Sequence, residues 1–166
     1  MHAFVATWCA ALLSAALATP SLPQSQAPDL RTRFEHEANP VQKAKLMPAL
    51  GDAEFAEIRK DAEANNLTEA ASVLRRYRDD VRNCVKGLEG AKLNAEKHPA
   101  GFKQLQFSVQ EALRRVDTLL PAMTSDEQAP FLEVRKDLDE TNRHLIDQLF
   151  PGKSPEQPQP AQLKER

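Results

Sequence analysis

The segment "LRRYRDDVRNCVKGLEGAKLNA", residues 74–95, sets the expectation for the fold. Its apolar residues recur in alternating steps of three and four, which is the spacing that brings side chains to one face of an α-helix. The members of this stripe are Leu74, Tyr77, Val81, Cys84, Leu88, Ala91 and Ala95. The pattern predicts a long amphipathic helix near residues 69–97 that buries this face in a core.

The same arrangement returns twice in the second half of the chain. One further helix is predicted near residues 101–120, and its stripe comprises Phe102, Leu105, Val109, Ala112, Val116 and Leu119. Another is predicted near residues 127–149, and its stripe comprises Phe131, Val134, Leu138, Thr141, Leu145 and Leu149. The joins between these helices are short, and short joins favour antiparallel neighbours. Thr124 or Ser125 is the expected N-cap of the last helix, because Glu127 or Gln128 follows three residues later.

The upstream segment predicts shorter helices. Asn39 is a suitable N-cap and Pro40 suits the first helical position. Pro48 and the pair Gly51-Asp52 are expected to split this segment into helices near 40–50 and 53–64, because proline removes a backbone donor. The predicted fold class is therefore all-α: an antiparallel helical bundle of three long helices plus one or two shorter N-terminal helices, spanning residues 34–150.

The ends of the chain predict export and polar linkers. Residues 1–18 contain an uncharged apolar run followed by Ala16-Leu17-Ala18, which together are typical of a secretory signal peptide. The run has no preceding Lys or Arg, and an uncleaved membrane anchor is the alternative. Residues 19–33 and the Pro/Gln-rich residues 151–166 are expected to be disordered. The expected location is periplasmic or extracellular, with no membrane span after cleavage.

Composition narrows the class of function. The 166 residues are 41% hydrophobic and 28% charged, with a net charge of −2, which fits a single domain with a real core. This charge balance argues against nucleic-acid binding, which normally needs a basic surplus on one face. No motif for a cofactor or for a catalytic constellation is present, so we expect neither a cofactor nor enzymatic activity.

Cys84 and one acidic and histidine cluster are the candidate site residues. The stripe places Cys84 in the core, where a thiol behaves as a small apolar group, although dimerisation, redox sensing or catalysis are alternatives. Asp137, Glu140 and His144 follow one another at steps of three and four. One helical ridge would thus present three ligand types, which makes them weak candidates for metal binding. The alternative places His144 at the core boundary beside Leu145.

Two surface features complete the candidates. The charges of residues 75–82 could bind an anion, but Arg75 with Asp79 and Arg76 with Asp80 form i, i+4 pairs that are expected to satisfy one another. The predicted break between Pro48 and Phe55 could expose Leu46, Met47 and Leu50 as a contact surface, and the alternative is that these residues cover one end of the bundle. Phe107 lies off the stripe of its helix, which predicts that its ring is exposed.

Four segments carry a resemblance to other proteins. They are "HPAGFKQLQFSVQEALRRVDTLL" (98–120), "DEQAPFLEVRKDLDETNRHLIDQLF" (126–150), "NPVQKAKLMPALGDAEF" (39–55) and "LRRYRDDV" (74–81). Over roughly residues 34–150 the chain resembles uncharacterised exported α-helical proteins of acidobacterial soil bacteria. The resemblance implies export and a helical fold, and it assigns no functional residue.

These observations favour an exported helical module that has a structural or protein-interaction role in the cell envelope. The alternative is a helical bundle of the periplasm that binds a small ligand or a metal. A protein partner is compatible with the sequence, which does not specify that partner or an oligomeric state.

Overall fold

A computed structural model describes residues 26–152, and this part of the chain is helical without strands. Its elements are α1 (Gln26–His36), α2 (Pro40–Glu63), α3 (Leu67–Gly90), α4 (Pro99–Leu119), the 3-10 helix η1 (Leu120–Ala122) and α5 (Ser125–Leu149). The predicted all-α class is confirmed. Four of these helices are long, whereas the sequence pattern predicted three.

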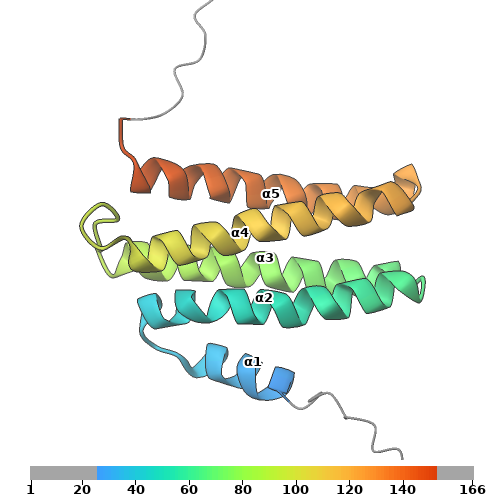
Figure 1. The fold of residues 1–166 in the computed structure, drawn as a ribbon, viewed down its shortest axis with the longest axis horizontal. Helices are drawn as coiled ribbons and strands as arrows, with labels where there is room; N and C mark the ends of the chain where they lie inside the picture. Colours follow the sequence, from blue (N-terminus) through green and yellow to red (C-terminus); the bar gives the residue numbers. More distant parts are fainter. Residues whose placement is uncertain (1–25, 153–166) are drawn as a thin grey trace, which may run out of the picture.

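The four long helices pack around one core, and α1 lies on the outer side of α2 (Figure 1). Successive long helices run in opposite directions. Figure 1 shows that α2 and α4 consequently run the same way, and these two helices pack against each other. Helix α5 packs on α4 and α3, so that α2, α3, α5 and α4 succeed one another around the core.

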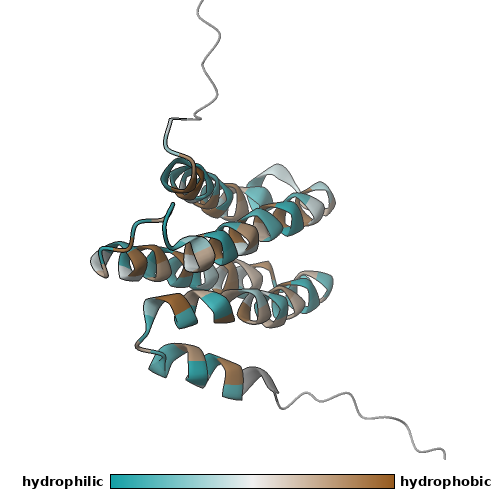
Figure 2. Ribbon diagram, turned by 60° about the vertical axis from the view of Figure 1, so that its left-hand side comes forward, coloured by the Kyte–Doolittle hydropathy of each residue, from teal (hydrophilic) through white to brown (hydrophobic). Residues whose placement is uncertain are grey.

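The core is made from the apolar stripes. Bands of hydrophobic and hydrophilic residues succeed one another along each helix, as expected of amphipathic helices (Figure 2). The largest fully buried side chains are Tyr77, Phe34, Phe102, Phe131, Met47, Leu50, Ile58, Leu74, Leu88, Leu105, Leu138 and Leu145. Every long helix and α1 contributes to this set, so the described residues form a single packed unit.

The expected break in the upstream segment is wrong, because α2 is one continuous helix with Pro48 inside it. Met47, Leu50, Phe55 and Ile58 are all buried along α2. Burying such a continuous apolar face against α3 and α4 outweighs the loss of one backbone hydrogen bond. The candidate contact surface at Leu46, Met47 and Leu50 is therefore not exposed. Met47 and Leu50 are buried and Leu46 packs against the core, which agrees with the alternative that these residues cover the bundle.

The start of the bundle also differs from the prediction. Residues 19–33 were expected to be a disordered linker, but α1 begins at Gln26. Phe34 anchors α1 with only 2% of its surface exposed, and Leu30 one turn earlier packs against the core. An aromatic anchor supported by a second apolar residue is enough to dock a short helix on a preformed bundle. The predicted signal peptide, the first part of the linker and residues 153–166 lie outside the described residues.

Helix α3 ends at Gly90, seven residues before the predicted end at 97. Glycine is unfavourable in a helix by about 1 kcal/mol relative to alanine, and both Gly87 and Gly90 lie in the last turn. The chain then turns through Lys92, whose φ is 52°, and it still buries Ala95. The predicted stripe is therefore wrong at Ala91, which is exposed, and right at Ala95, which is buried although it belongs to a turn.

Helix α5 starts where the sequence indicated. Thr124 is its N-cap, and the Glu127 carboxylate accepts hydrogen bonds from both the backbone N–H and the hydroxyl of Thr124, each at 2.8 Å. Between residues 26 and 152 no helix is long and apolar enough to cross a membrane.

Candidate functional site

The predicted metal-ligand residues each have a different partner. Asp137 accepts hydrogen bonds from Arg78 at 3.1 Å and pairs with Arg82 at 3.0 Å. His144 places its Nε2 atom 2.6 Å from Glu89 Oε1 across the α3–α5 contact. Among the residues that the structure describes, no three His, Cys, Asp or Glu side chains gather where they could hold a metal ion.

Cys84 lies in the core with 1% of its surface exposed. Burial raises the pKa of its thiol from 9.0 to about 12, despite the opposing charge of Lys43. A thiol in these surroundings is a poor nucleophile at neutral pH.

The expected i, i+4 pairs within residues 75–82 are wrong. Asp79 binds its neighbour Arg78 at 3.0 Å, while Arg76 and Asp80 bind residues of other helices. Arg76 donates a hydrogen bond of 2.9 Å to Glu54 on α2. Asp80 accepts a hydrogen bond of 2.5 Å from Arg31 on α1. These contacts join α1, α2 and α3, and they could not be inferred from the sequence of α3 alone.

Glu54 is the buried centre of this ion network. It is 3% exposed, and its Oε1 atom accepts hydrogen bonds from both Arg31 and Arg76. Burial raises the pKa of Glu54, while the two arginines lower it less strongly. The network thus holds α1 on the bundle, although burial disfavours the charged form of Glu54.

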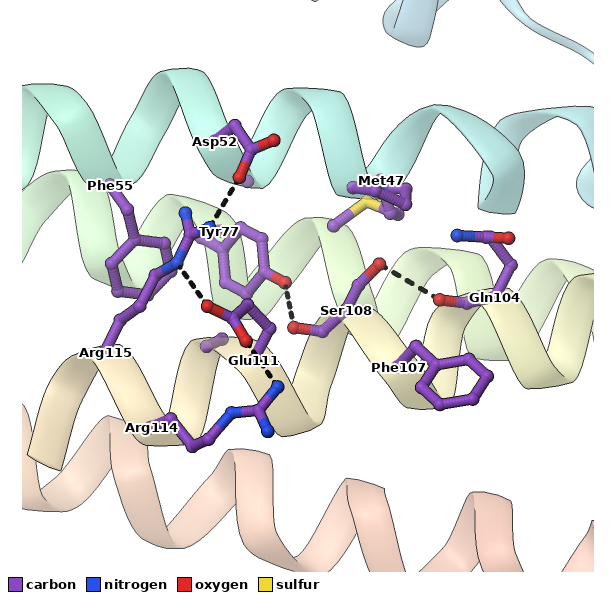
Figure 3. A pocket seen from close by; sticks show the side chains of 13 residues that line it. Met47, Asp52, Phe55, Tyr77, Gln104, Phe107, Ser108, Glu111, Arg114 and Arg115 are labelled. Carbon is purple, nitrogen blue, oxygen red and sulfur yellow. Dashed lines mark hydrogen bonds and ion pairs between the residues drawn. The ribbon is translucent and has the colours of Figure 1, made fainter.

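An open hollow of about 250 Å³ lies between α2 and α4, and this is the strongest candidate site (Figure 3). Its apolar lining residues are Met47, Pro48, Gly51, Phe55, Tyr77, Phe107 and Ala112. Its polar lining residues are Asp52, Gln104, Ser108, Glu111, Arg114 and Arg115. We call it the first hollow.

Tyr77 reaches from α3 to form the floor of the first hollow. Its hydroxyl donates a hydrogen bond of 3.0 Å to the backbone carbonyl of Ser108 on α4. Its ring packs edge-on against Phe55, with 5.5 Å between the ring centroids. Gly51 leaves room for the ring, because a Cβ atom at that position would lie 3.2 Å from Tyr77 Cε2.

One ion pair crosses from α2 to α4 at one end of the first hollow, and Gln104 and Phe107 lie at the other end (Figure 3). Arg115 donates to Asp52 at 2.6 Å and to Glu111 at 3.0 Å. Arg114 also binds Glu111. Hydrogen bonds from Arg115 and then Arg114 lower the pKa of Glu111, so this carboxylate is held in its charged form.

A second hollow, of about 370 Å³, continues beyond the ion pairs. It shares Asp52, Phe55 and Arg115 with the first hollow and adds Ala56, Arg59, Thr118 and Leu119. We call the two hollows together the α2–α4 groove. The groove extends along most of α4, with a charged bridge between two partly apolar depressions.

Phe107 is the most exposed large apolar side chain of the described residues, at 61%. The sequence indicated its exposure, because it lies off the stripe of its helix. The groove itself was not predicted, since it depends on an unbroken α2 and on α2 and α4 lying side by side. With its apolar walls and fixed charges, the groove is suited to binding a segment or a small molecule.

No protein-family model, curated protein or solved structure gives a significant match to this chain.

Proposed function

We propose that this chain is an exported protein-interaction module of the cell envelope and that it binds its partner in the α2–α4 groove. One observation carries the proposal: Phe107 is 61% exposed while it also lines the first hollow. Aromatic residues beside a depression are typical anchors of protein interfaces. Export is supported by the pattern of residues 1–18 and by the resemblance to exported helical proteins.

Site-specific photo-crosslinking tests the groove. Benzoylphenylalanine at position 107 should give a defined crosslinked product in the native envelope fraction. The same group at position 132 is the matched control, because Leu132 is also exposed, at 43%, but lies on α5 outside the groove. Equal crosslinking at both positions, or none at 107, contradicts the proposal.

Export is tested separately by the intact mass of the native protein. Cleavage after Ala18 predicts a mature chain that begins at Thr19. A periplasmic product that retains residues 1–18 contradicts cleavage and favours the membrane-anchor alternative.

A small-ligand bundle is the second candidate, and the size of the second hollow favours it. This hollow measures about 370 Å³, which is in the range of small-molecule sites. Native mass spectrometry of untagged protein distinguishes the two functions, because a bound small molecule adds a constant mass that Ala56→Trp in the second hollow should remove.

A further inference from the structure

We infer that the segment which binds the α2–α4 groove is an acidic amphipathic α-helix of the partner protein, with apolar residues in the two hollows and a carboxylate near Arg114. This inference rests on the proposed function and specifies the chemistry of the partner.

The spacing of the hollows fits a helix. On α4 the first hollow is lined from Gln104 to Arg115, and the second from Arg115 to Leu119. The midpoints of these two ranges lie about seven residues apart, which at 1.5 Å per residue is roughly 10 Å. Residues seven apart on a helix point in nearly the same direction, because two turns contain about seven residues. Two anchors of one partner helix can therefore reach both hollows.

The chain already docks one helix on the bundle in this manner. Helix α1 lies on α2, with Phe34 buried to 2% exposure and Arg31 bound to Glu54 and Asp80. In α1, an apolar anchor and a charged anchor thus lie together on the side that packs on α2. The α2–α4 groove offers the same two kinds of contact with the charges reversed, because here the bundle supplies the arginines.

The charge of the groove selects an acidic partner. Its lining contains three guanidinium groups, of Arg59, Arg114 and Arg115, against two carboxylates, of Asp52 and Glu111. Both carboxylates bind Arg115. Within residues 26–152 the guanidinium of Arg114 binds Glu111 alone, and the Arg114 side chain is 67% exposed. A carboxylate of the partner can bind Arg114 without breaking the bridge, whereas a lysine there would be repelled.

Two synthetic peptides of about 16 residues serve as probes, and they share leucines at positions i, i+4 and i+7. One carries Glu and the other Lys on the flank that faces α4. Fluorescence anisotropy with the full mature protein should show at least about tenfold tighter binding of the Glu peptide. Arg114→Glu should reverse this preference, Phe107→Ser should weaken binding about tenfold, and Leu132→Ser should leave it unchanged. Circular dichroism melting confirms that each variant is folded.

Each other result overturns the inference in a distinguishable way. Equal binding of the two peptides refutes the acidic chemistry, and binding that Phe107→Ser leaves intact refutes the groove as the site. If neither peptide binds at about 1 mM while crosslinking at position 107 persists, the proposed function stands and the helical partner is wrong. Self-association in sedimentation that Phe107→Ser abolishes would identify a second copy as the occupant instead.

Discussion

The hydroxyl of Tyr77 on α3 donates a 3.0 Å hydrogen bond to the backbone carbonyl of Ser108 on α4, and the ring lies directly against Gly51 on α2. One side chain therefore contacts both walls of the α2–α4 groove from below. Burial raises the pKa of Tyr77 further above its ordinary value, so the phenol stays protonated and keeps its role as a donor. The width of the groove depends on this residue and on the missing side chain at position 51.

Gly51→Ala is expected to destabilise the protein by about 1 kcal/mol. Overpacking reduces the free energy of unfolding by about 1–3 kcal/mol, and the higher helix propensity of alanine offsets about 1 kcal/mol of this loss. The new Cβ would lie 3.2 Å from Tyr77 Cε2, so the ring must shift and strain its bond to Ser108. Urea unfolding followed by circular dichroism measures the change.

Gly90→Ala is the matched control for that substitution. No atom lies within 4 Å of the position of its new Cβ, and the residue ends α3. Reduced entropy of the unfolded chain should make this variant neutral or more stable by about 0.5 kcal/mol. If both glycine variants change stability alike, the contact with Tyr77 is not the limiting factor at position 51.

Acidification from pH 7 to pH 5 should raise the free energy of unfolding through the protonation of Glu54. Burial raises the pKa of Glu54 above 4.5 in the folded state, so the folded protein binds the proton more readily than the unfolded chain. The stability that Glu54 contributes is complete below 4.5 and is lost as the pH rises through the folded pKa. Asp80 acts in the same direction, since burial raises its pKa too.

Glu54→Gln should reduce this gain in the free energy of unfolding between pH 7 and pH 5. Urea unfolding at the two pH values measures it, and Glu133→Gln is the control because Glu133 is exposed on α5, away from this network. Glu89 and Glu111 have lowered pKa values. Their contribution to the stability of the protein is lost only as the pH falls below 4.5, which is outside this window. A variant at position 54 with the full pH dependence of the wild type would contradict the role given to Glu54.

Periodicity alone was sufficient to identify most of the helices. The helices near 101–120 and 127–149 correspond to α4 and α5, because their stripes have no competing signal. The capping box of Thr124 and Glu127 also marks the start of α5. The stripe through Leu74 and Leu88 placed α3 and the buried position of Cys84 correctly. Such local patterns report which face of a helix is apolar, and burial follows directly from that.

The features that the sequence did not predict all depend on contacts between helices. Pro48 signals a break only if the packing of α2 on α3 and α4 is ignored. Asp80 has an arginine four residues earlier, yet it binds Arg31 from a segment that composition assigned to a linker. The groove arises because α2 and α4 are parallel neighbours, and one sequence does not state which helices are adjacent.

Arg31 tests how strongly the ion network holds α1. Arg31→Met removes the donor shared by Glu54 and Asp80 and should cost about 2 kcal/mol, because two shielded carboxylates lose a partner. Arg76 still binds Glu54, which limits the loss. The double variant Arg31→Met/Glu54→Gln should lose less than the sum of the single variants, with a coupling energy of about 1 kcal/mol.

Hydrogen exchange of residues 30–36 measures the local effect of these single and double variants on α1. Arg31→Met should accelerate exchange in α1 while protection in α5 remains, since α1 docks as a separate helix on the bundle. Additive stability changes, or uniform loss of protection across all helices, would show that the network does not act on α1 specifically.

Cys84 should react with a thiol reagent far more slowly in the folded protein than in denaturant. A pKa raised from 9.0 to about 12 leaves about a thousandfold less thiolate, and the side chain is only 1% exposed. A Cys9→Ser background makes Cys84 the only thiol in the chain, and dithionitrobenzoate absorbance at pH 8 follows its reaction. Because access requires unfolding of the region around α3, the logarithm of the rate should rise with the loss of stability in the Gly51→Ala variant. A loss of about 1 kcal/mol gives a rate about fivefold higher. Equal rates in buffer and in denaturant would mean that the thiol is accessible in the native state, which would restore dimerisation or redox sensing as roles for this residue.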